Sequence, residues 1–294
     1  MERYDILVIG PVSLDTNIDH LGNVRREVGG AVVASGYAAA NSGNRTAVFT
    51  KLNPQDADVQ ERFAASGADL YWKPSGATCA IQNRYFTADK ERRECRSLGV
   101  CDPFRFEELP EVTAAAYQFA GLVYGDFDGA LFEAAAKHGK VAVDAQGLLR
   151  HVEPDGSMVL RDWAEKERYL PLFDYFKTDA AEAEILTGLT DRAAAARQLC
   201  AWGAKEVLIT HNTEVLSYDG QTVRTCPIKA RNLSGRTGRG DTAFAGYVTE
   251  RARADADAAL RYCAALVSLK METPGPFRGT RQDVLAYLEE FYEK

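Results

Sequence analysis

The chain has 294 residues, of which 46% are hydrophobic and 26% are charged, a composition typical of a globular protein with a large core. Its net charge of −7 and isoelectric point near 5.3 give no basic field for a nucleic-acid backbone, so we expect no nucleic-acid partner. No stretch has the length and apolarity of a membrane span, and no signal-like segment precedes the first strand. We therefore expect a cytoplasmic protein without membrane contact.

The six cysteines are scattered without C-x-x-C spacing, and a chain of this size needs no disulfide framework. We predict that they are reduced and mostly core thiols: Cys79, Cys95, Cys101, Cys200, Cys226 and Cys263.

The first predicted element is an apolar strand over 4–10 that ends at Gly10, and Asp15 follows it closely. A carboxylate just beyond the C-terminal end of a first buried strand lies where open α/β sheets bind ligands. It could hold two hydroxyls of a polyol. The alternative is that Asp15 is a turn residue that caps its own loop.

Gly29 and Gly30 precede ten small or apolar residues, which predict a helix over 31–40. A strand over 45–51 and a helix over 54–66 follow. Residues 68–100 do not alternate with helices, and they contain three predicted strands and a polar turn, at 68–73, 77–87, 94–100 and 89–92.

The alternation of strands and helices then resumes, with the βαβ rhythm of a parallel sheet. Its predicted strands are 118–124, 141–144, 175–178 and 205–210. Its predicted helices are 128–138, one that ends at Gly188, 256–271 and 281–292, and a hairpin turn is expected over 218–221.

Asp179 and Glu182 have the spacing D-x-x-E where a strand leads into a helix. A carboxylate at this position can order the waters of Mg²⁺, which keeps much of its hydration shell. Taken alone, the same spacing is typical of a capping box, in which both side chains only close the helix N-terminus.

Gly235, Gly238 and Gly240 lie within six residues, before an apolar pattern that predicts a helix beginning at Asp241. The free N–H groups and the positive dipole end of such a helix suit a phosphate. A carboxylate there could take the proton of a hydroxyl that attacks the phosphate. The alternative is that Asp241 is an N-cap and the glycines form only a turn.

Two other phosphate-binding motifs do not fit this chain. A Walker A loop is absent, because Gly139-Lys140 is followed by Val141. Gly238-x-Gly240-x-x-Ala243 imitates a dinucleotide fingerprint, but it lies late in the chain and leads into further helical sequence, which argues against a dehydrogenase.

The run T-G-R-G-D-T over 237–242 resembles the second signature of the ribokinase/PfkB carbohydrate kinase family, usually D-T-x-G-A-G-D. Gly235 and Arg236 stand where that pattern has Asp-Thr, and Arg239 stands where it has Ala. The loss of Asp-Thr weakens the basis for any monovalent-cation site associated with that segment. The two arginines suggest extra positive charge near the phosphates.

Other segments are similar to motifs of the same family, in the same order. G-G at 29–30 resembles the first signature, D-A-Q-G over 144–147 with Arg150 resembles D-x-N-x-R, and D-x-x-E over 179–182 resembles N-x-x-E. Two departures stand out. Ala34 replaces a frequent Asn, and H-N-T-E over 211–214 replaces glycines that underlie the nucleotide phosphates.

The resemblance implies a fold and an activity. The fold is α/β with a doubly wound, mainly parallel sheet over 1–294 as one domain, and a small β lid formed by about 17–28 and 68–100. The activity is phosphorylation of a sugar, cyclitol or nucleoside hydroxyl, with ATP and Mg²⁺. It also suggests a homodimer through the lid. The alternative is a non-catalytic sugar or nucleotide sensor on the same fold, motivated by Ala34 and the altered anion loop.

The resemblance also implies roles for individual residues. The catalytic group comprises the base Asp241 with Gly238, Arg239 and Gly240. ATP and Mg²⁺ would be bound by Asp179, Glu182, Thr210, Arg236, Gly238 and Gly240, with Glu182 holding Mg²⁺ through water. The acceptor would be bound by Asp15, Gly29, Gly30, Gln146, Arg150 and Asp241.

The acceptor itself is suggested by the segment that follows the expected lid. R-S-L-G-V-C-D-P-F over 96–104, followed by E-L-P at 108–110, is similar to the corresponding segment of inositol kinases in this family. We therefore place myo-inositol or a related cyclitol first, ahead of nucleosides and ketohexoses.

Overall fold

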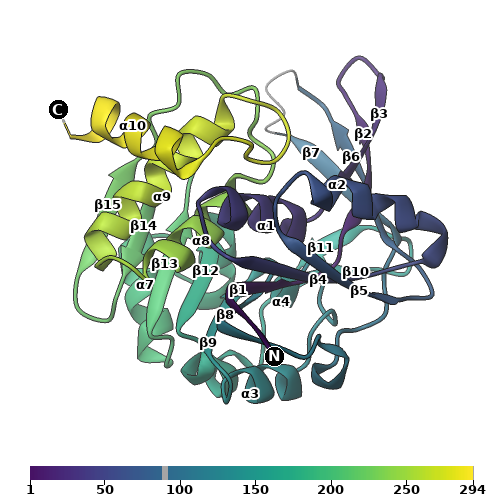
Figure 1. Ribbon diagram of the computed structural model, residues 1–294, viewed down its shortest axis with the longest axis horizontal. Helices are drawn as coiled ribbons and strands as arrows, with labels where there is room; N and C mark the ends of the chain where they lie inside the picture. Colours follow the sequence, from purple (N-terminus) through teal and green to yellow (C-terminus); the bar gives the residue numbers. More distant parts are fainter. Residues whose placement is uncertain (88–91, 294) are drawn as a thin grey trace.

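The structure, a computed structural model, describes residues 1–87 and 92–293 (Figure 1). Its main layer is a nine-stranded sheet with the strand order β15-β14-β13-β12-β9-β8-β1-β4-β5. The strands from β13 to β5 in this order pair in parallel, and β14 and β15 add an antiparallel edge. The doubly wound, mainly parallel sheet that the sequence predicts is confirmed.

The parallel strands are covered on both faces, which is why their sequences read as nearly continuous apolar runs. The strands of this sheet are β1 (Glu2–Ile9), β4 (Thr46–Leu52), β5 (Asp69–Pro74), β8 (Val112–Phe119), β9 (Lys140–Asp144), β12 (Tyr175–Asp179), β13 (Glu206–Thr210), β14 (Glu214–Tyr218) and β15 (Val223–Pro227).

The helices form a layer on each face of the sheet. On one face, α1, α8 and α9 pack side by side, and α10 packs on α9. On the other face, α6 and α7 pack together over β12 to β14, and α3 packs on β9. The helices are α1 (Ala31–Asn41), α2 (Gln60–Ala64), α3 (Gly129–Ala135), α4 (Gln146–Leu149), α5 (Lys166–Tyr169), α6 (Ala180–Thr187), α7 (Arg192–Ala201), α8 (Arg239–Glu250), α9 (Ala256–Met271) and α10 (Arg281–Tyr292), with short 3₁₀ turns at Pro54–Val59, Phe106–Glu108 and Leu170–Leu172.

Strand β12 shows how the sheet directs side chains to the two layers. The ring of Tyr175 contacts the ring of Tyr247 on α8, whereas Phe176 faces Phe173 in the aromatic core of the other layer. Because side chains alternate along a strand, Lys177 points to the same side as Tyr175, toward α8.

A second sheet of four strands, in the order β3-β2-β6-β7, projects from the main sheet (Figure 1). It consists of β2 (Ser13–Ile18), β3 (Val24–Gly29), β6 (Cys79–Tyr85) and β7 (Arg93–Gly99). We call this sheet the lid. A separate hairpin of β10 (Arg150–Val152) and β11 (Met158–Leu160) lies beside β7, where Ser97 N donates to Gly156 O at 2.8 Å.

The extent of the lid differs from our prediction. Residues 69–74 form β5, which pairs with β4 at the edge of the main sheet and is not part of the lid. The lid also begins earlier than residue 17, because β2 starts at Ser13. Asp15 is therefore a lid-strand residue and not a residue of a loop after β1. The turn that we predicted over 89–92 falls largely outside the described residues.

Three predicted elements need correction. The helix over 54–66 is a 3₁₀ turn followed by the short α2, because the backbone of Asp56 leaves the helical region (φ −104°, ψ 23°). The strand over 118–124 is β8, which starts at Val112 and ends at Phe119, and the alanine-rich start of that strand concealed it. Helix α8 begins at Arg239, two residues before Asp241.

The cysteine prediction agrees with the structure. All six are free thiols, and Cys79, Cys101, Cys226 and Cys263 are buried. None of the helices within residues 1–87 and 92–293 combines the length and apolarity that a membrane span requires.

Candidate functional site

A cleft of about 400 Å³ lies between the lid and the main sheet, at the ends of β12 and β13 and the starts of α1 and α8. The carboxyl ends of parallel strands and the amino ends of the following helices meet at such an edge, where open α/β sheets bind ligands. All the site residues that we predicted line this one cleft: Asp15, Gly29, Gly30, Gln146, Arg150, Asp179, Glu182, Thr210, Arg236, Gly238, Arg239, Gly240 and Asp241.

The N-terminus of α8 forms the floor of the cleft. Gly238 is its N-cap, with a left-handed backbone (φ 77°) that favours glycine. A Cβ atom on Gly238 would also come within 3.0 Å of the Cβ of Ala34 on α1. Asp241 is therefore not the N-cap, and its side chain stays available to the cleft.

The side chain of Asp241 is half-buried, and both acidic and basic side chains lie near it. Burial is the main cause that raises its pKa, and the carboxylate of Asp144 adds to this effect. Lys177, Arg150 and Lys270 oppose it. A carboxylate with a raised pKa is a better proton acceptor than an exposed one, which suits a general base.

Lys177 occupies the centre of the buried charges, although the sequence analysis did not single it out. Its Nζ donates to Asp144 Oδ1 at 3.1 Å and lies 3.8 Å from Glu182 Oε2. Burial alone would lower the pKa of Lys177, but Asp144, Glu182, Asp241 and Asp179 raise it above its ordinary value. Lys177 is thus a permanent ammonium below the cleft.

The ammonium of Lys177 lies close to the N-terminus of α8 because residue 240 is a glycine. A Cβ atom on Gly240 would lie 3.1 Å from Lys177 Nζ and 3.8 Å from Thr210 Oγ1. The absence of a side chain lets the strand ends of β12 and β13 approach the first turn of the helix. N–H groups of that turn and a fixed ammonium therefore converge on one place, an arrangement that suits an anion.

Asp179 and Glu182 form a complete capping box at the start of α6. Asp179 Oδ1 accepts from Glu182 N at 2.8 Å, and Glu182 Oε2 accepts from Asp179 N at 2.7 Å. Burial raises the pKa of Glu182 to about 7, while the nearby ammonium of Lys177 opposes that shift. The capping interpretation is correct for the local structure, and a role toward Mg²⁺ would come in addition to it.

A metal ion bound directly by protein side chains does not fit this cleft. Within residues 1–87 and 92–293, no three or more His, Cys, Asp or Glu side chains are grouped as metal ligands. Glu182 faces the cleft but already uses Oε2 for capping. The residues present fit Mg²⁺ that keeps its water shell and is bound mainly by the phosphates of a ligand.

Asp15 lies across the cleft from the α8 floor, on lid strand β2. Ser13 Oγ donates to Asp15 Oδ1 at 2.5 Å, and burial raises the pKa of Asp15 to about 6. Gly29 is needed here because its Cβ would lie 2.5 Å from Asp15 Oδ2. The next glycine, Gly30, has φ 100° and caps α1.

Gln146 and Arg150 form a connected pair between the two sides of the cleft. Arg150 Nη2 donates to Gln146 Oε1 at 2.8 Å, and Gln146 Nε2 donates to Gly121 O at 3.2 Å. Burial raises the pKa of both Asp15 and Asp241, and the charge of Arg150 opposes both shifts.

The turn between β13 and β14 contacts the first turn of α8. His211 N donates to Glu214 O at 3.0 Å, and Asn212 Oδ1 accepts from Arg239 Nη2 at 3.0 Å. Glu214 pairs with Arg192 at 2.6 Å and so uses its charge away from the anion site.

The lid adds a row of polar side chains that the sequence analysis did not identify. Asn83 Nδ2 donates to Asn17 Oδ1 at 3.1 Å, and Cys95 Sγ donates to Asn83 Oδ1 at 3.2 Å. All three line the cleft. Their positions on β2, β6 and β7 follow from strand register, which requires knowing how the lid strands pair.

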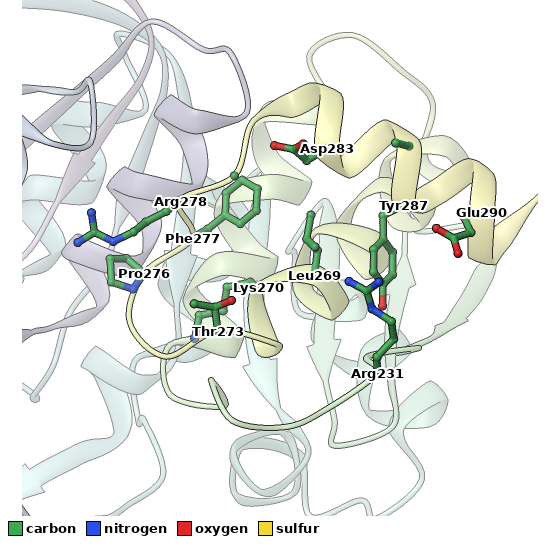
Figure 2. Close-up of a pocket in the computed structure, with 12 residues that line it drawn as sticks. Arg231, Leu269, Lys270, Thr273, Pro276, Phe277, Arg278, Asp283, Tyr287 and Glu290 are labelled. Atoms are coloured by element: carbon green, nitrogen blue, oxygen red, sulfur yellow. The ribbon is translucent and has the colours of Figure 1, made fainter.

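A second cavity of about 460 Å³ lies between α9, α10 and the loop over 273–279. Figure 2 shows Arg231 against the ring of Tyr287, with Phe277 below α10 and Lys270 at the inner end. Pro276 borders both this cavity and the cleft.

Lys177 and Lys270 were missed for different reasons. Lys177 is a charged residue inside an otherwise apolar buried strand, and this signal was visible in the sequence. Lys270 gave no comparable signal, because a lysine in the last turn of a helix is ordinary and its burial depends on packing.

Comparisons with known proteins identify the family of the chain. A family model described as pfkB family carbohydrate kinase matches residues 4–280. A cytidine kinase of Thermococcus kodakarensis is 29% identical over 248 residues, which cover 82% of this chain and 86% of that protein. The resemblance that the sequence motifs suggest is confirmed.

Solved structures of similar fold cover nearly the whole chain. A pyrophosphate-dependent kinase of the ribokinase family, complexed with a pyrophosphate analogue and myo-inositol, is 33% identical with a TM-score of 0.88, over 96% of this chain and 99% of that one. A ribokinase of Arabidopsis thaliana, complexed with ribose and ATP, has a TM-score of 0.77 at 17% identity, over 98% of this chain and 99% of that one.

Proposed function

The chain belongs to the pfkB family of carbohydrate kinases, and from this membership and the geometry of the cleft we propose that it transfers a phosphoryl group from pyrophosphate to a hydroxyl of a cyclitol such as myo-inositol. The observation that carries the proposal is the position of Asp241. Its carboxylate stands between the anion floor made by α8 and Lys177 and the polar lid that carries Asp15.

The proposed step needs one proton acceptor and one anion site. The acceptor hydroxyl gives its proton to Asp241 while its oxygen forms a bond to the phosphorus of the donor. The bond from that phosphorus to the leaving phosphate breaks at the same time. The N–H groups of Gly238, Arg239 and Gly240 and the ammonium of Lys177 offset the charge on the transferring group. Asp15, Gly30 and the Gln146–Arg150 pair orient the acceptor.

Pyrophosphate as donor is supported by the density of cationic side chains. Lys177, Arg236 and Arg239 line the cleft beside the first turn of α8, and Lys270 lies behind them. Pyrophosphate offers only charge and oxygen atoms for recognition, so a binding site for it must supply cations. A structure at 33% identity is that of a pyrophosphate-dependent kinase.

ATP, the donor that the motifs suggest, is the second candidate, and one observation favours it. The second cavity, with the rings of Phe277 and Tyr287 and the side chains of Leu269 and Pro276, is of a size and character that suit a nucleotide base. Pro276 borders both cavities, so a base there would lie next to the phosphate floor.

Mg²⁺ would accompany either donor, with Glu182 and Asp179 facing its water shell. When bound, it would neutralise charge on the donor phosphates. Glu182 keeps its capping hydrogen bond in this arrangement.

The cyclitol acceptor is supported by the polar lid and by the structural relative that contains myo-inositol. Asn17, Asn83 and Asp15 offer both donors and acceptors, which a ring with hydroxyls on every carbon requires. A nucleoside is the next candidate acceptor, because a cytidine kinase is 29% identical.

The test combines two donors with five acceptors. The full chain is incubated with Mg²⁺ and either pyrophosphate or ATP, together with inositol, ribose, fructose, adenosine or cytidine. The value of kcat/KM is measured by ³¹P NMR, or by released phosphate for pyrophosphate and released ADP for ATP. We expect pyrophosphate with inositol to give the highest value. Turnover with ATP but not with pyrophosphate would contradict pyrophosphate as the donor. Turnover of another acceptor, with inositol at the background rate, would contradict a cyclitol as the acceptor.

The rival function is a non-catalytic sensor, which would bind these ligands without turnover. The sensor function would be favoured if calorimetry shows binding of inositol or pyrophosphate while no donor and acceptor pair gives a product. Product formation that disappears in Asp241→Asn would exclude it.

A further inference from the structure

Lys270 lies in the last turn of α9, with 2% of its surface exposed. Its ammonium donates to two backbone carbonyls, those of Gly235 and Thr237. Both belong to the loop that leads into α8. A buried ammonium on backbone carbonyls is unusual, because lysines are almost never fully buried without a partner of opposite charge.

The loop that Lys270 holds is pressed onto the C-terminal end of α9. Gly235 N donates to Met271 O at 2.7 Å, and Ser234 Oγ donates to Glu272 O at 2.8 Å. A Cβ atom on Gly235 would lie 2.0 Å from Thr273 O, so the loop has no room to move closer. Carbonyl groups therefore converge here from the loop and from the helix end.

Converging carbonyls at a helix C-terminus make an electronegative pocket that suits a cation. Such a pocket can be filled by a monovalent ion from solution or by a tethered ammonium, since both present a single positive charge to oxygen ligands. Here the ammonium is tethered. Burial lowers the pKa of Lys270 to about 8, while Asp241 opposes that shift, so the group is still mostly protonated at neutral pH.

We propose that Lys270 is a built-in monovalent cation of the donor site: its ammonium fixes the carbonyls of Gly235 and Thr237 and thereby aims the N–H groups of the following turn at the donor phosphate. Lys270 is a positioning residue in this scheme, since it acts through the backbone of the loop. The inference rests on the proposed function, and it goes beyond it because it predicts how the protein responds to potassium and ammonium ions.

The charges of Arg236 and Arg239, which we expected to add positive charge near the phosphates, lie in a different place from the ammonium of Lys270. Arg239 reaches the hairpin at Asn212, and both arginines line the cleft. Lys270 instead acts from behind the loop, at the carbonyl oxygens.

The test uses Lys270→Ala and Lys270→Met in the full chain, in buffers whose only cations besides Mg²⁺ are tetramethylammonium ions. The Ala variant leaves a space beside the two carbonyls, whereas Met fills that space without charge. We expect both variants to bind pyrophosphate at least about tenfold more weakly and to turn over at least about tenfold more slowly than wild type. Ammonium, methylammonium or potassium ions should restore the Ala variant in a saturable way and leave the Met variant and wild type unchanged.

A matched control is Lys51→Ala. Lys51 is also buried, and its ammonium donates to Pro103 O at 2.8 Å and pairs with Glu108 at 2.7 Å, far along the chain from the loop. We expect this variant to lose stability and to show no recovery of pyrophosphate binding with added cations.

Pyrophosphate binding is measured by calorimetry, independently of turnover. If the protein binds pyrophosphate but phosphorylates no acceptor, the proposed function is wrong, whereas this inference is not affected. The inference is overturned if wild type is activated severalfold by potassium. It is equally overturned if Lys270→Ala binds pyrophosphate and turns over like wild type, or if none of the added cations restores the binding and turnover of this variant. If the Ala variant does not fold, the potassium titration of wild type and the Met variant decide the question.

Discussion

At the scale of single residues, the cleft is organised by opposite charges held close together below its floor. Lys177 sits among Asp144, Glu182 and Asp241, and its pKa is raised in spite of its burial. Removing one member would leave a buried charge without its partner, which costs more than the pair contributes. Burial and Asp144 raise the pKa of Asp241, and the ammonium of Lys177 opposes that shift.

Asp241→Asn is expected to lower kcat by about 10²- to 10⁴-fold, because the amide keeps the shape but cannot accept the proton. The KM of the acceptor should change little. The check is steady-state kinetics, with thermal unfolding to show that the variant remains folded. A kcat near that of wild type would refute the role of Asp241 as base.

Glu182→Gln is expected to raise the Mg²⁺ concentration needed for half-maximal rate. Glutamine at this position retains the capping hydrogen bond to the backbone, so the local fold should persist. Glu184→Gln, on the exposed face of the same helix, is the matched control. If both variants titrate like wild type, Glu182 is only a capping residue.

The pH dependence of acceptor binding should report Asp15. Its raised pKa of about 6 means that the carboxylate is ionised above that pH and protonated below it. An ionised carboxylate can accept two hydroxyl hydrogen bonds, so the KM of the acceptor should rise as pH falls through about 6. A flat KM profile between pH 5 and pH 8, measured beside Asp15→Asn, would show that Asp15 does not contact the acceptor.

At the scale of elements, two helix N-termini meet in the cleft. Gly30 caps α1 and Gly238 caps α8, and both have positive φ. Ala34 on α1 lies next to Gly238 and lines the cleft, so the short side chain at this position offers no hydrogen-bonding group to a ligand.

Gly238→Ala should both destabilise the protein and weaken donor binding. The left-handed backbone costs an L-residue about 1–2 kcal/mol, and the added methyl group would press on Ala34. Gly188→Ala is the control, because Gly188 has φ 71° with nothing within 4 Å of the added atom. Both variants should lose stability in denaturant, Gly238→Ala by more because of the contact with Ala34, but only Gly238→Ala should raise the Kd for pyrophosphate.

The sequence predicted most of the main sheet and the residues of the cleft, because apolar runs and glycine spacing are local signals. It did not predict that Asp15 belongs to the lid, since strand pairing is a long-range property. The alanine-rich start of β8 had too little β propensity to be recognised. The roles of Lys177 and Lys270 depend on which buried groups they meet, and only the tertiary structure shows that.

At the scale of the whole molecule, the lid has β3 at its edge, and within residues 1–87 and 92–293 this strand is paired on one side only, with β2. Val24 and Leu21, at its start and in the turn before it, are exposed. An exposed edge strand is a ready surface for pairing with another chain, which supports the proposed homodimer through the lid.

The dimer is tested by sedimentation of wild type and Val24→Asp at micromolar concentration. We expect a dimer for wild type and a shift toward monomer for the variant, with Leu160→Asp, an exposed residue outside the lid sheet, as control. A monomeric wild type would rule out this assembly.

The hairpin beside β7 links the lid to the chemistry in a way that neither part shows alone. Ser97 on the lid donates to Gly156 in the hairpin, and that hairpin begins with Arg150. The hydrogen bond between Ser97 and Gly156 therefore connects lid strand β7, through the hairpin, to a guanidinium that lines the cleft beside Gln146.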